Sequence, residues 1–296
     1  MPGPAERQRL LFGLNVSTSA GPGSDPVADA QAAEALGFDF VSSSDHPCGT
    51  QPSYETWTML SWIAAETTTI EVATRVLGVP YRNPAMTAKM AETLDRLSGG
   101  RLILGLGAGA SDDEFRAFGL PVDSMRDRIT GLEEAVRIAR GLWTSPVFTC
   151  DGQVHTTDNA PMEPKPNGPI PIWLGTFGPR GLTVTGRLAD GWIPSLGHAP
   201  ADQLEPMRER VVRAAEDAGR DPAAIRCVLN AEARVDERAE PTPDALAGPP
   251  DAVVERILGF IDIGFTAFNF MPAGTDKQAQ AERLAYEVIP ALRAAH

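Results

Sequence analysis

Residues 70–106 read IEVATRVLGVPYRNPAMTAKMAETLDRLSGGRLILGL, and they hold the signals for a strand, a helix and a second strand. The β-branched apolar run Ile70–Leu77 predicts a strand. Pro84–Leu97 predicts a helix, because proline is favoured at a first helical position and Gly99-Gly100 ends the pattern. Arg101–Leu106 predicts the next strand. A strand, a helix and a strand in this order form a β-α-β unit, whose two strands lie parallel.

The same alternation continues along the whole chain. The expected strands are Leu10–Val16, Phe38–Ser43, Ile70–Leu77, Arg101–Leu106, Pro171–Leu174, Asp190–Pro194, Ile225–Asn230 and Thr266–Met271. Helical patterns include Pro26–Leu36, Thr56–Thr67, Pro84–Leu97 and a long amphipathic helix that Asp123 caps and that reaches Trp143. Several strands are continuous apolar runs, as in sheets covered on both faces.

About eight β-α units in 296 residues, without a clear linker, predict one α/β domain over residues 1–296, a (β/α)₈ TIM barrel. An open doubly wound sheet is the alternative arrangement of the same elements. Two segments depart from the alternation. Phe148–His155, turned by Asp151-Gly152, predicts a hairpin inserted in the fourth connection. The acidic, proline-rich segment Asp236–Pro250 is predicted to be a loop after the seventh strand.

Composition excludes several classes of partner. The formal net charge of −13 argues against nucleic acid, which calls for a basic surface. No run of about 18 apolar residues occurs, so no membrane span is expected. The first residues lack a cleavage pattern, so we expect a cytoplasmic protein. The three cysteines, Cys48, Cys150 and Cys227, are scattered without metal-ligand spacing, which predicts reduced thiols and no metal. Motifs of metal hydrolysis, serine hydrolysis and nucleotide-triphosphate chemistry are absent.

The chemistry of a parallel barrel lies where its strands end. The second strand ends in Ser44-Asp45-His46-Pro47, and an imidazole beside a carboxylate suits proton transfer near neutral pH. We therefore expect His46 to be an acid or base that Asp45 orients; a hydrogen-bonded, inert loop histidine is the alternative. His198, which follows the sixth strand, is a candidate ligand contact.

Two glycine-rich strand ends suggest a bound ligand. Residues 105–110, GLGAGA, satisfy the G-x-G-x-x-A pattern of dinucleotide-binding domains, but Ser111-Asp112-Asp113-Glu114 then places carboxylates where a pyrophosphate would lie. We interpret these glycines instead as room for a flat ring system close to the backbone. Gly175–Arg180, ahead of a helix, resembles an anion cradle to which Ser195 would add a hydroxyl; plain βα turns are the alternative.

Read in order, several blocks of the chain resemble the luciferase-like monooxygenase family, in its branch of oxidoreductases that use the deazaflavin coenzyme F420. The blocks are Ser44-Asp45-His46, Tyr81-Arg82-Asn83-Pro84, Leu94-Asp95-Arg96-Leu97-Ser98-Gly99-Gly100-Arg101, Leu104-Gly105-Leu106-Gly107-Ala108-Gly109, Glu114-Phe115, Leu142-Trp143, Pro171-Ile172-Trp173-Leu174-Gly175 and Ala189-Asp190-Gly191-Trp192. The resemblance covers nearly the whole chain.

The resemblance implies a (β/α)₈ barrel that holds a flavin or deazaflavin, commonly as a homodimer. It implies His46 as the proton donor or acceptor beside the ring. It also implies that a non-prolyl cis peptide at Arg75-Val76 backs the ring. The cofactor-binding residues that we expect are Asp45, Arg75, Val76, Gly107, Gly109, Asp113, Phe177, Gly178, Ser195 and His198. Arg180 and His198 would offer a cationic exit for the acidic tail of F420.

We therefore expect an oxidoreductase that transfers a hydride between a small organic substrate and bound F420. A monooxygenase that uses reduced FMN and oxygen is the alternative, and a non-catalytic flavin-binding paralogue is a third reading. Two departures bear on the substrate. Members that oxidise sugar phosphates have a tryptophan where this chain has Thr50, and a lysine where it has His198. The sequence therefore argues against a sugar phosphate.

Overall fold

The computed structural model describes residues 8–296. Its main sheet closes on itself: the strand order β10-β12-β1-β2-β3-β5-β8-β9 ends with β9 paired to β10, and every pair is parallel. The strands are β1 (Leu11–Asn15), β2 (Phe40–Ser43), β3 (Glu71–Thr74), β4 (Leu77–Gly78), β5 (Leu102–Gly107), β8 (Ile172–Gly175), β9 (Gly191–Trp192), β10 (Arg226–Val235) and β12 (Ala267–Pro272). The barrel prediction is confirmed, and the open sheet is excluded.

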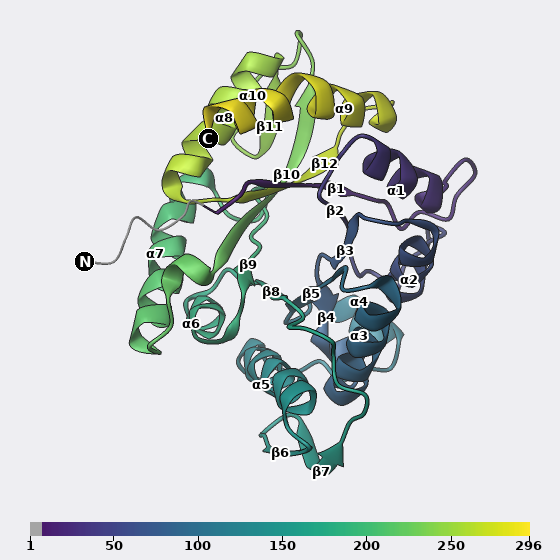
Figure 1. The fold of residues 1–296 in the computed structure, drawn as a ribbon, viewed down its shortest axis with the longest axis vertical. Helices are drawn as coiled ribbons and strands as arrows, with labels where there is room; N and C mark the ends of the chain where they lie inside the picture. Colours follow the sequence, from purple (N-terminus) through teal and green to yellow (C-terminus); the bar gives the residue numbers. More distant parts are fainter. Residues whose placement is uncertain (1–7) are drawn as a thin grey trace.

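Helices surround the strands in chain order, so that the colours pass around the molecule from purple to yellow (Figure 1). They are α1 (Pro26–Ala35), α2 (Thr56–Glu66), α3 (Pro84–Ser98), α5 (Met125–Thr144), α6 (Pro179–Leu188), α7 (Ala201–Asp217), α8 (Pro250–Ile263), α9 (Lys277–Arg283) and α10 (Ile289–Ala295). Within the described residues, no helix is both long and apolar enough to cross a membrane.

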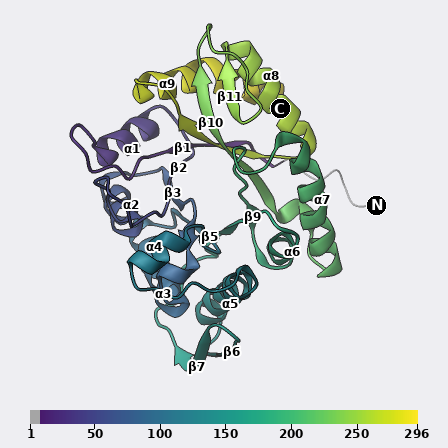
Figure 2. The ribbon, with the colours of Figure 1, turned by 180° about the vertical axis from the view of Figure 1, so that it is seen from behind.

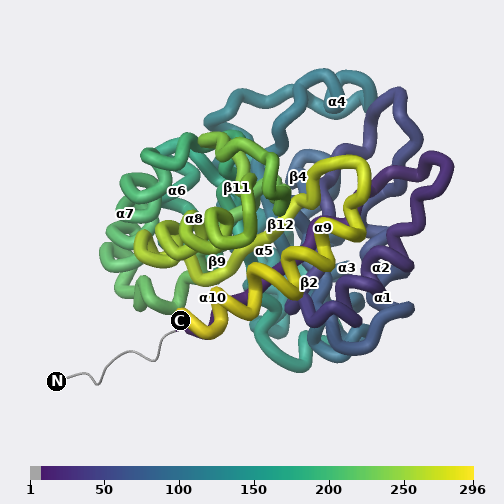
Figure 3. The backbone as a smooth tube through the Cα atoms, turned by 90° about the horizontal axis from the view of Figure 1, so that it is seen from above, coloured from purple at the N-terminus to yellow at the C-terminus, as the bar shows by residue number. Residues whose placement is uncertain are grey.

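Three features lie outside the plain alternation. The predicted hairpin is present as β6 (Val147–Asp151) and β7 (Thr156–Pro161), and it projects beside α5 (Figure 2). A short helix that we did not predict, α4 (Asp112–Ala117), follows β5, and its segment runs along one edge of the molecule (Figure 3). The segment Asp236–Pro250 is not simply a loop, because β11 (Ala245–Gly248) lies in it and pairs parallel with β10.

Two smaller predictions about local structure were wrong. Ser124, rather than Asp123, caps α5, because its hydroxyl accepts the backbone N–H of Asp127 at 3.2 Å. The strand predicted over Ile70–Leu77 is interrupted, with β3 and β4 on either side of Arg75-Val76. That peptide bond is cis and non-prolyl, as the resemblance implied. The interruption lies at the end of β3, next to the mouth of the barrel.

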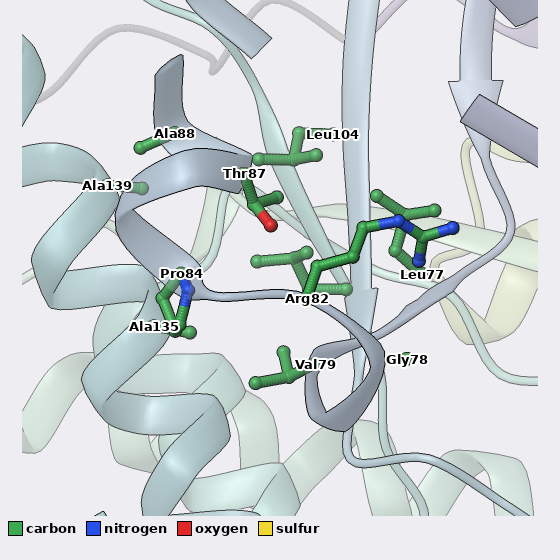
Figure 4. Close-up of a pocket in the computed structure, with 11 residues that line it drawn as sticks. Leu77, Gly78, Val79, Arg82, Pro84, Thr87, Ala88, Leu104, Ala135 and Ala139 are labelled. Atoms are coloured by element: carbon green, nitrogen blue, oxygen red, sulfur yellow. The ribbon is translucent and has the colours of Figure 1, made fainter. Parts of the chain in front are cut away.

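The apolar core has two parts. Inside the barrel, Phe40 meets the edge of Trp173 at 5.4 Å between ring centroids, and a Cβ on Gly13 would lie 2.1 Å from the Phe40 ring. Between strands and helices, small side chains permit close approach. Ala135 and Ala139 of α5 line one small pocket together with Thr87 of α3 and with Leu77 and Leu104 of the strands (Figure 4). In the same view Arg82 extends past Leu77, away from these alanines.

Candidate active site

A cavity of about 1300 Å³ opens at the carboxyl ends of the barrel strands. Its lining includes every predicted site residue except Asp113: His46, Asp45, Arg75, Val76, Gly107, Gly109, Phe177, Gly178, Ser195 and His198. The Asp113 side chain is 96% exposed and pairs with Arg116 on the outside of α4. The expectation that Asp113 lines the site was therefore wrong. In the described residues, no group of three or more His, Cys, Asp or Glu side chains could hold a metal ion.

Asp45 is a buried structural carboxylate. Its Oδ2 accepts the Gly78 N–H at 3.0 Å, and Arg82 donates to both of its oxygens, at 2.7 and 3.0 Å. Arg82 also pairs with Glu55, whose carboxylate caps the first turn of α2. These contacts tie the end of β2 to β4 and α2. The predicted role of Asp45 as the group that orients His46 was wrong, because both of its oxygens serve this cluster.

His46 is held instead by Glu114 of α4. The His46 Nδ1 lies 3.0 Å from Glu114 Oε1, and the Tyr81 hydroxyl donates to Glu114 Oε2 at 2.6 Å. Burial and the bond to Glu114 raise the pKa of Tyr81, so its phenol stays protonated and remains a donor. A carboxylate that accepts from Nδ1–H leaves Nε2 as the basic nitrogen of the imidazole. The His46 side chain is 57% exposed, so that nitrogen can reach a ligand.

The floor of the cavity is a flat, apolar platform. Val76 projects from the cis bond over the ends of β5 and β8, where Gly107 and Gly175 pair. A Cβ on Gly107 would lie 2.6 Å from Val76 Cγ2, and one on Gly175 would lie 3.1 Å from the same atom. Only glycine therefore leaves room for Val76 at Gly107. Such a surface suits a planar ring, and the residues present fit a deazaflavin or flavin.

The wall beyond the platform suits a polar tail. Helix α6 starts after Gly178, where added atoms would meet nothing within 4 Å, and backbone N–H groups at a helix start attract anions. Phe177 packs against His198 with ring centroids 5.9 Å apart. Arg180, expected at the exit, directs both terminal nitrogens to α5, at the Arg126 carbonyl and the Thr130 hydroxyl. The charge of Arg180 lies near the expected exit of the cofactor tail, but its two terminal nitrogens already donate to α5.

A chain of hydrogen bonds crosses the barrel just below the cavity. The Ser42 hydroxyl donates to Asn269 Oδ1 at 2.8 Å, and Asn269 Nδ2 donates to Asn230 Oδ1 at 2.7 Å. Asn230 Nδ2 then donates to the Ser195 hydroxyl oxygen at 2.7 Å. Both asparagines are fully buried. Because Ser195 accepts this bond, its own hydrogen is left to donate to a ligand in the cavity.

Sequence reasoning missed several residues of the site. Glu114, Tyr81 and Arg82 stood inside the blocks that carry the resemblance, but none was assigned a role. For Glu114 a signal existed, since Ser111-x-x-Glu114 is the pattern of a helix start, and Ser111 does cap α4. For Arg82 the sequence held no such signal, because its partner Asp45 is 37 residues away.

Known proteins that are similar to this chain point to the same kind of site. Residues 11–246 match the family described as luciferase-like monooxygenase. The chain belongs to that family. An F420-dependent glucose-6-phosphate dehydrogenase from Nakamurella multipartita is 30% identical, over 96% of this chain and 97% of the relative. A 5,10-methylenetetrahydromethanopterin reductase from Methanolobus tindarius is 34% identical, over 79% of this chain and 72% of the relative.

Solved structures support the same fold for this luciferase-like protein. An F420-dependent secondary alcohol dehydrogenase with a bound F420-acetone adduct superposes with a TM-score of 0.87 and 21% identity, covering 96% of this chain and 99% of that one. The F420-dependent tetrahydromethanopterin reductase of Methanopyrus kandleri superposes with a TM-score of 0.80 and 21% identity, covering 96% and 100%. The predicted family and its enzymatic character are confirmed, and the choice of F420 agrees with these relatives.

Proposed function

We propose that the protein is an F420-dependent oxidoreductase that moves a hydride between a small organic substrate and the deazaflavin, with His46 as the acid and base. The observation that carries the proposal is a histidine fixed by a partly buried carboxylate beside a flat platform: His46 on Glu114, next to Val76 and Gly107. The F420-dependent dehydrogenase from Nakamurella multipartita supports F420 as the cofactor.

Bound F420 supplies one ring carbon that accepts or releases a hydride, so the protein must orient the substrate, exclude water and handle one proton. When an alcohol is oxidised, its C–H and O–H bonds break and a carbonyl forms. His46 Nε2 takes the hydroxyl proton, and Glu114 stabilises the resulting imidazolium through Nδ1–H. In reduction the same imidazolium returns the proton. Tyr81 keeps Glu114 in place throughout.

The cofactor would occupy the platform and the wall beyond it. Val76, Gly107 and Gly175 would hold the ring, and the start of α6 at Gly178 with the Ser195 hydroxyl would receive the phosphate. His198 lies at the same wall, where an acidic tail would leave the cavity. These assignments rest on the cavity lining and on the donors left free there.

The substrate that we propose is a small organic molecule other than a sugar phosphate. The dehydrogenase from Nakamurella multipartita is named for glucose 6-phosphate, but Thr50 and His198 replace the tryptophan and lysine that we associate with that activity. A histidine lacks the fixed charge of a lysine ammonium, and the His198 ring packs against Phe177. A dianionic phosphate on the substrate would therefore meet less positive charge here.

We further propose a cytoplasmic homodimer. Exposed large apolar side chains on α2 and α3 support the dimer: Trp62 is 65% exposed, Met86 58% and Leu97 81%. Large apolar side chains gathered on one surface mark contact sites. Cys48, Cys150 and Cys227 are free thiols, which suits a reducing compartment. Sedimentation of the wild type and of Leu97→Glu tests the dimer, and an unchanged monomer in both would refute it.

The cofactor assignment is tested by titrating apo-protein separately with F420 and with FMN while following the cofactor fluorescence. We expect quenching with F420 and a weaker response to FMN. Gly107→Val serves as the matched variant, because its side chain must displace Val76 from the platform. It should lose F420 binding. Tight FMN binding without a response to F420 would overturn the proposal and favour monooxygenation.

A further inference from the structure

Arg75 lines the cavity, and the proposed chemistry leaves its charge unused. Its Nε donates to Asn15 Oδ1 at 3.1 Å, and within residues 8–296 this is its only side-chain hydrogen bond. No carboxylate there pairs with it. Arg208 Nε is the only fully buried side-chain nitrogen or oxygen without a partner among those residues, so the two terminal nitrogens of Arg75 keep some accessible surface, and Arg75 lines the cavity. A guanidinium fork thus faces the ligand space with no counter-ion.

The environment of Arg75 makes this arrangement costly without a ligand. Burial lowers the pKa of Arg75 to about 10, and no nearby charge offsets the burial. The side chain remains a cation at neutral pH. Of the carboxylates that line the cavity, Asp45 is already paired with Arg82, and Glu232 and Asp244 form no ion pair with Arg75. A buried charge is stable when a partner of opposite sign is present. Within residues 8–296 the guanidinium of Arg75 therefore has no ion-pair partner.

The direction of the side chain separates Arg75 from the ring platform. The platform lies over β4, β5 and β8, whereas Arg75 turns the other way around the barrel to reach Asn15 at the end of β1. His46 follows β2, which lies between β1 and β3. Arg75 and His46 thus share one arc of the mouth, and this arc adjoins the platform, because β3 pairs with β5. A molecule held between them lies where a substrate must lie to face the ring.

We propose that Arg75 binds a carboxylate of the substrate, so that the enzyme acts on small carboxylic acids whose reacting carbon lies next to His46. A carboxylate matches the fork, because two parallel N–H groups meet its two oxygens. It also matches the charge, since one guanidinium balances one negative charge while a phosphate carries nearly two. Asn15 fixes the plane of the fork through Nε. The proposal that the bound carboxylate belongs to the substrate rests on the proposed function. The expected preference of Arg75 for an anion does not rest on it.

The test compares benzoate with its uncharged isostere benzamide by calorimetric titration, in apo-protein and in protein loaded with F420. We expect benzoate to bind about ten- to hundredfold tighter in the wild type, as hydrogen bonds to charged groups usually allow. Arg75→Met should abolish the preference. Arg75→Lys should keep part of it, because the charge remains and the fork is lost. Arg137→Met, an exposed cation paired with Glu133 on α5, should change nothing.

The outcomes separate the two proposals. Binding of F420 without a preference for benzoate would overturn the carboxylate site and leave the cofactor assignment standing. A benzoate preference in apo-protein that fails to bind F420 would do the reverse. If Arg75→Met instead weakened binding of reduced F420 and left benzoate unaffected, the guanidinium would serve the cofactor, and the proposal would fail. Thermal unfolding of each variant verifies folding, and Arg75→Lys decides the question should Arg75→Met not fold.

Discussion

Asp45 and His46 are neighbours in the chain, yet they lie in opposite environments. The Asp45 side chain is fully buried, and both of its oxygens are engaged by Arg82 and a backbone N–H. The His46 side chain is more than half exposed and has one partner, Glu114, so that one ring nitrogen stays available. A polar group whose bonds are all satisfied stabilises the fold. One that is oriented by a single bond and left open on the other side can take part in a reaction.

The largest effect should come from His46→Ala. If Nε2 carries the proton, turnover falls by about 10²–10⁴-fold. The fold should survive, since the side chain is exposed and outside the core. Steady-state assays of F420 reduction, with circular dichroism as the check on folding, measure both. His296→Ala, near the C-terminus, is the matched control. An unchanged turnover number in folded His46→Ala would remove this residue from the mechanism.

Asp45→Asn should act on stability. Loss of the charge leaves Arg82 partly buried with only Glu55 beside it, and breaking a buried pair costs about 3–5 kcal/mol. Denaturant unfolding measures the change. Asp236→Asn removes a solvent-accessible carboxylate paired with Arg234 and should leave the free energy of unfolding nearly unchanged. If Asp45→Asn were as stable as wild type but inactive, the contrast between the two neighbours would be wrong.

Glu114→Gln tests whether the partner of His46 matters through its charge. The amide can still hold the ring but cannot stabilise an imidazolium as a carboxylate does, so turnover should fall about 10- to 100-fold. The pKa of Tyr81 should also fall, because the acceptor charge that raises it is gone. Ultraviolet titration against Tyr81→Phe isolates that phenol. An unaltered turnover number together with an unaltered titration of the Tyr81 phenol would show that the charge of Glu114 has no part in the reaction.

The smallest effect concerns Glu34, a carboxylate engaged like Asp45 but far from the cavity. Burial alone would raise the pKa of Glu34, but backbone N–H groups of Thr69, Ile70 and Thr68 outweigh it and lower the pKa to about 2. The stability that these bonds add is therefore present above about pH 4.5 and is lost as pH falls toward 2. Glu34→Gln should cost about 1 kcal/mol at pH 7, because exposure to solvent weakens the effect.

Unfolding curves of wild type and Glu34→Gln between pH 7 and pH 2 check this. The difference between them should shrink steadily below pH 4.5. A constant difference over that range would show that the pKa of Glu34 is not lowered, and that its bonds to the chain before β3 are not maintained in solution.

Much of the fold could be predicted from the sequence, because it depends on local signals. Apolar runs, proline at helix starts and paired glycines at helix ends placed the barrel strands and most helices. The interruption of β3 at Arg75-Val76 and the short strand β11 lacked such signals, since both depend on neighbouring strands.

The site residues that lie at strand ends could be predicted from the sequence. The prediction failed where the direction of a side chain depends on the phase of a helix, or where its partner is distant in sequence. Asp113 and Glu114 are adjacent, and the phase of α4 turns one to solvent and the other to His46. The partner of Asp45 could not be inferred from spacing, because Arg82 reaches it only after β3, β4 and the intervening turn have folded.

The hydrogen-bond chain below the cavity bears on how the protein is made. Ser42 and Asn269 are 227 residues apart in sequence, and Asn269 belongs to the last barrel strand. During translation, His46, Arg75 and Glu114 leave the ribosome long before Asn269 does. The growing chain can form its early β-α units, but Ser195 acquires its fixed donor only when Asn269 reaches Asn230. A nascent chain released before β12 would carry the reactive side chains and still lack the ordered mouth of the barrel.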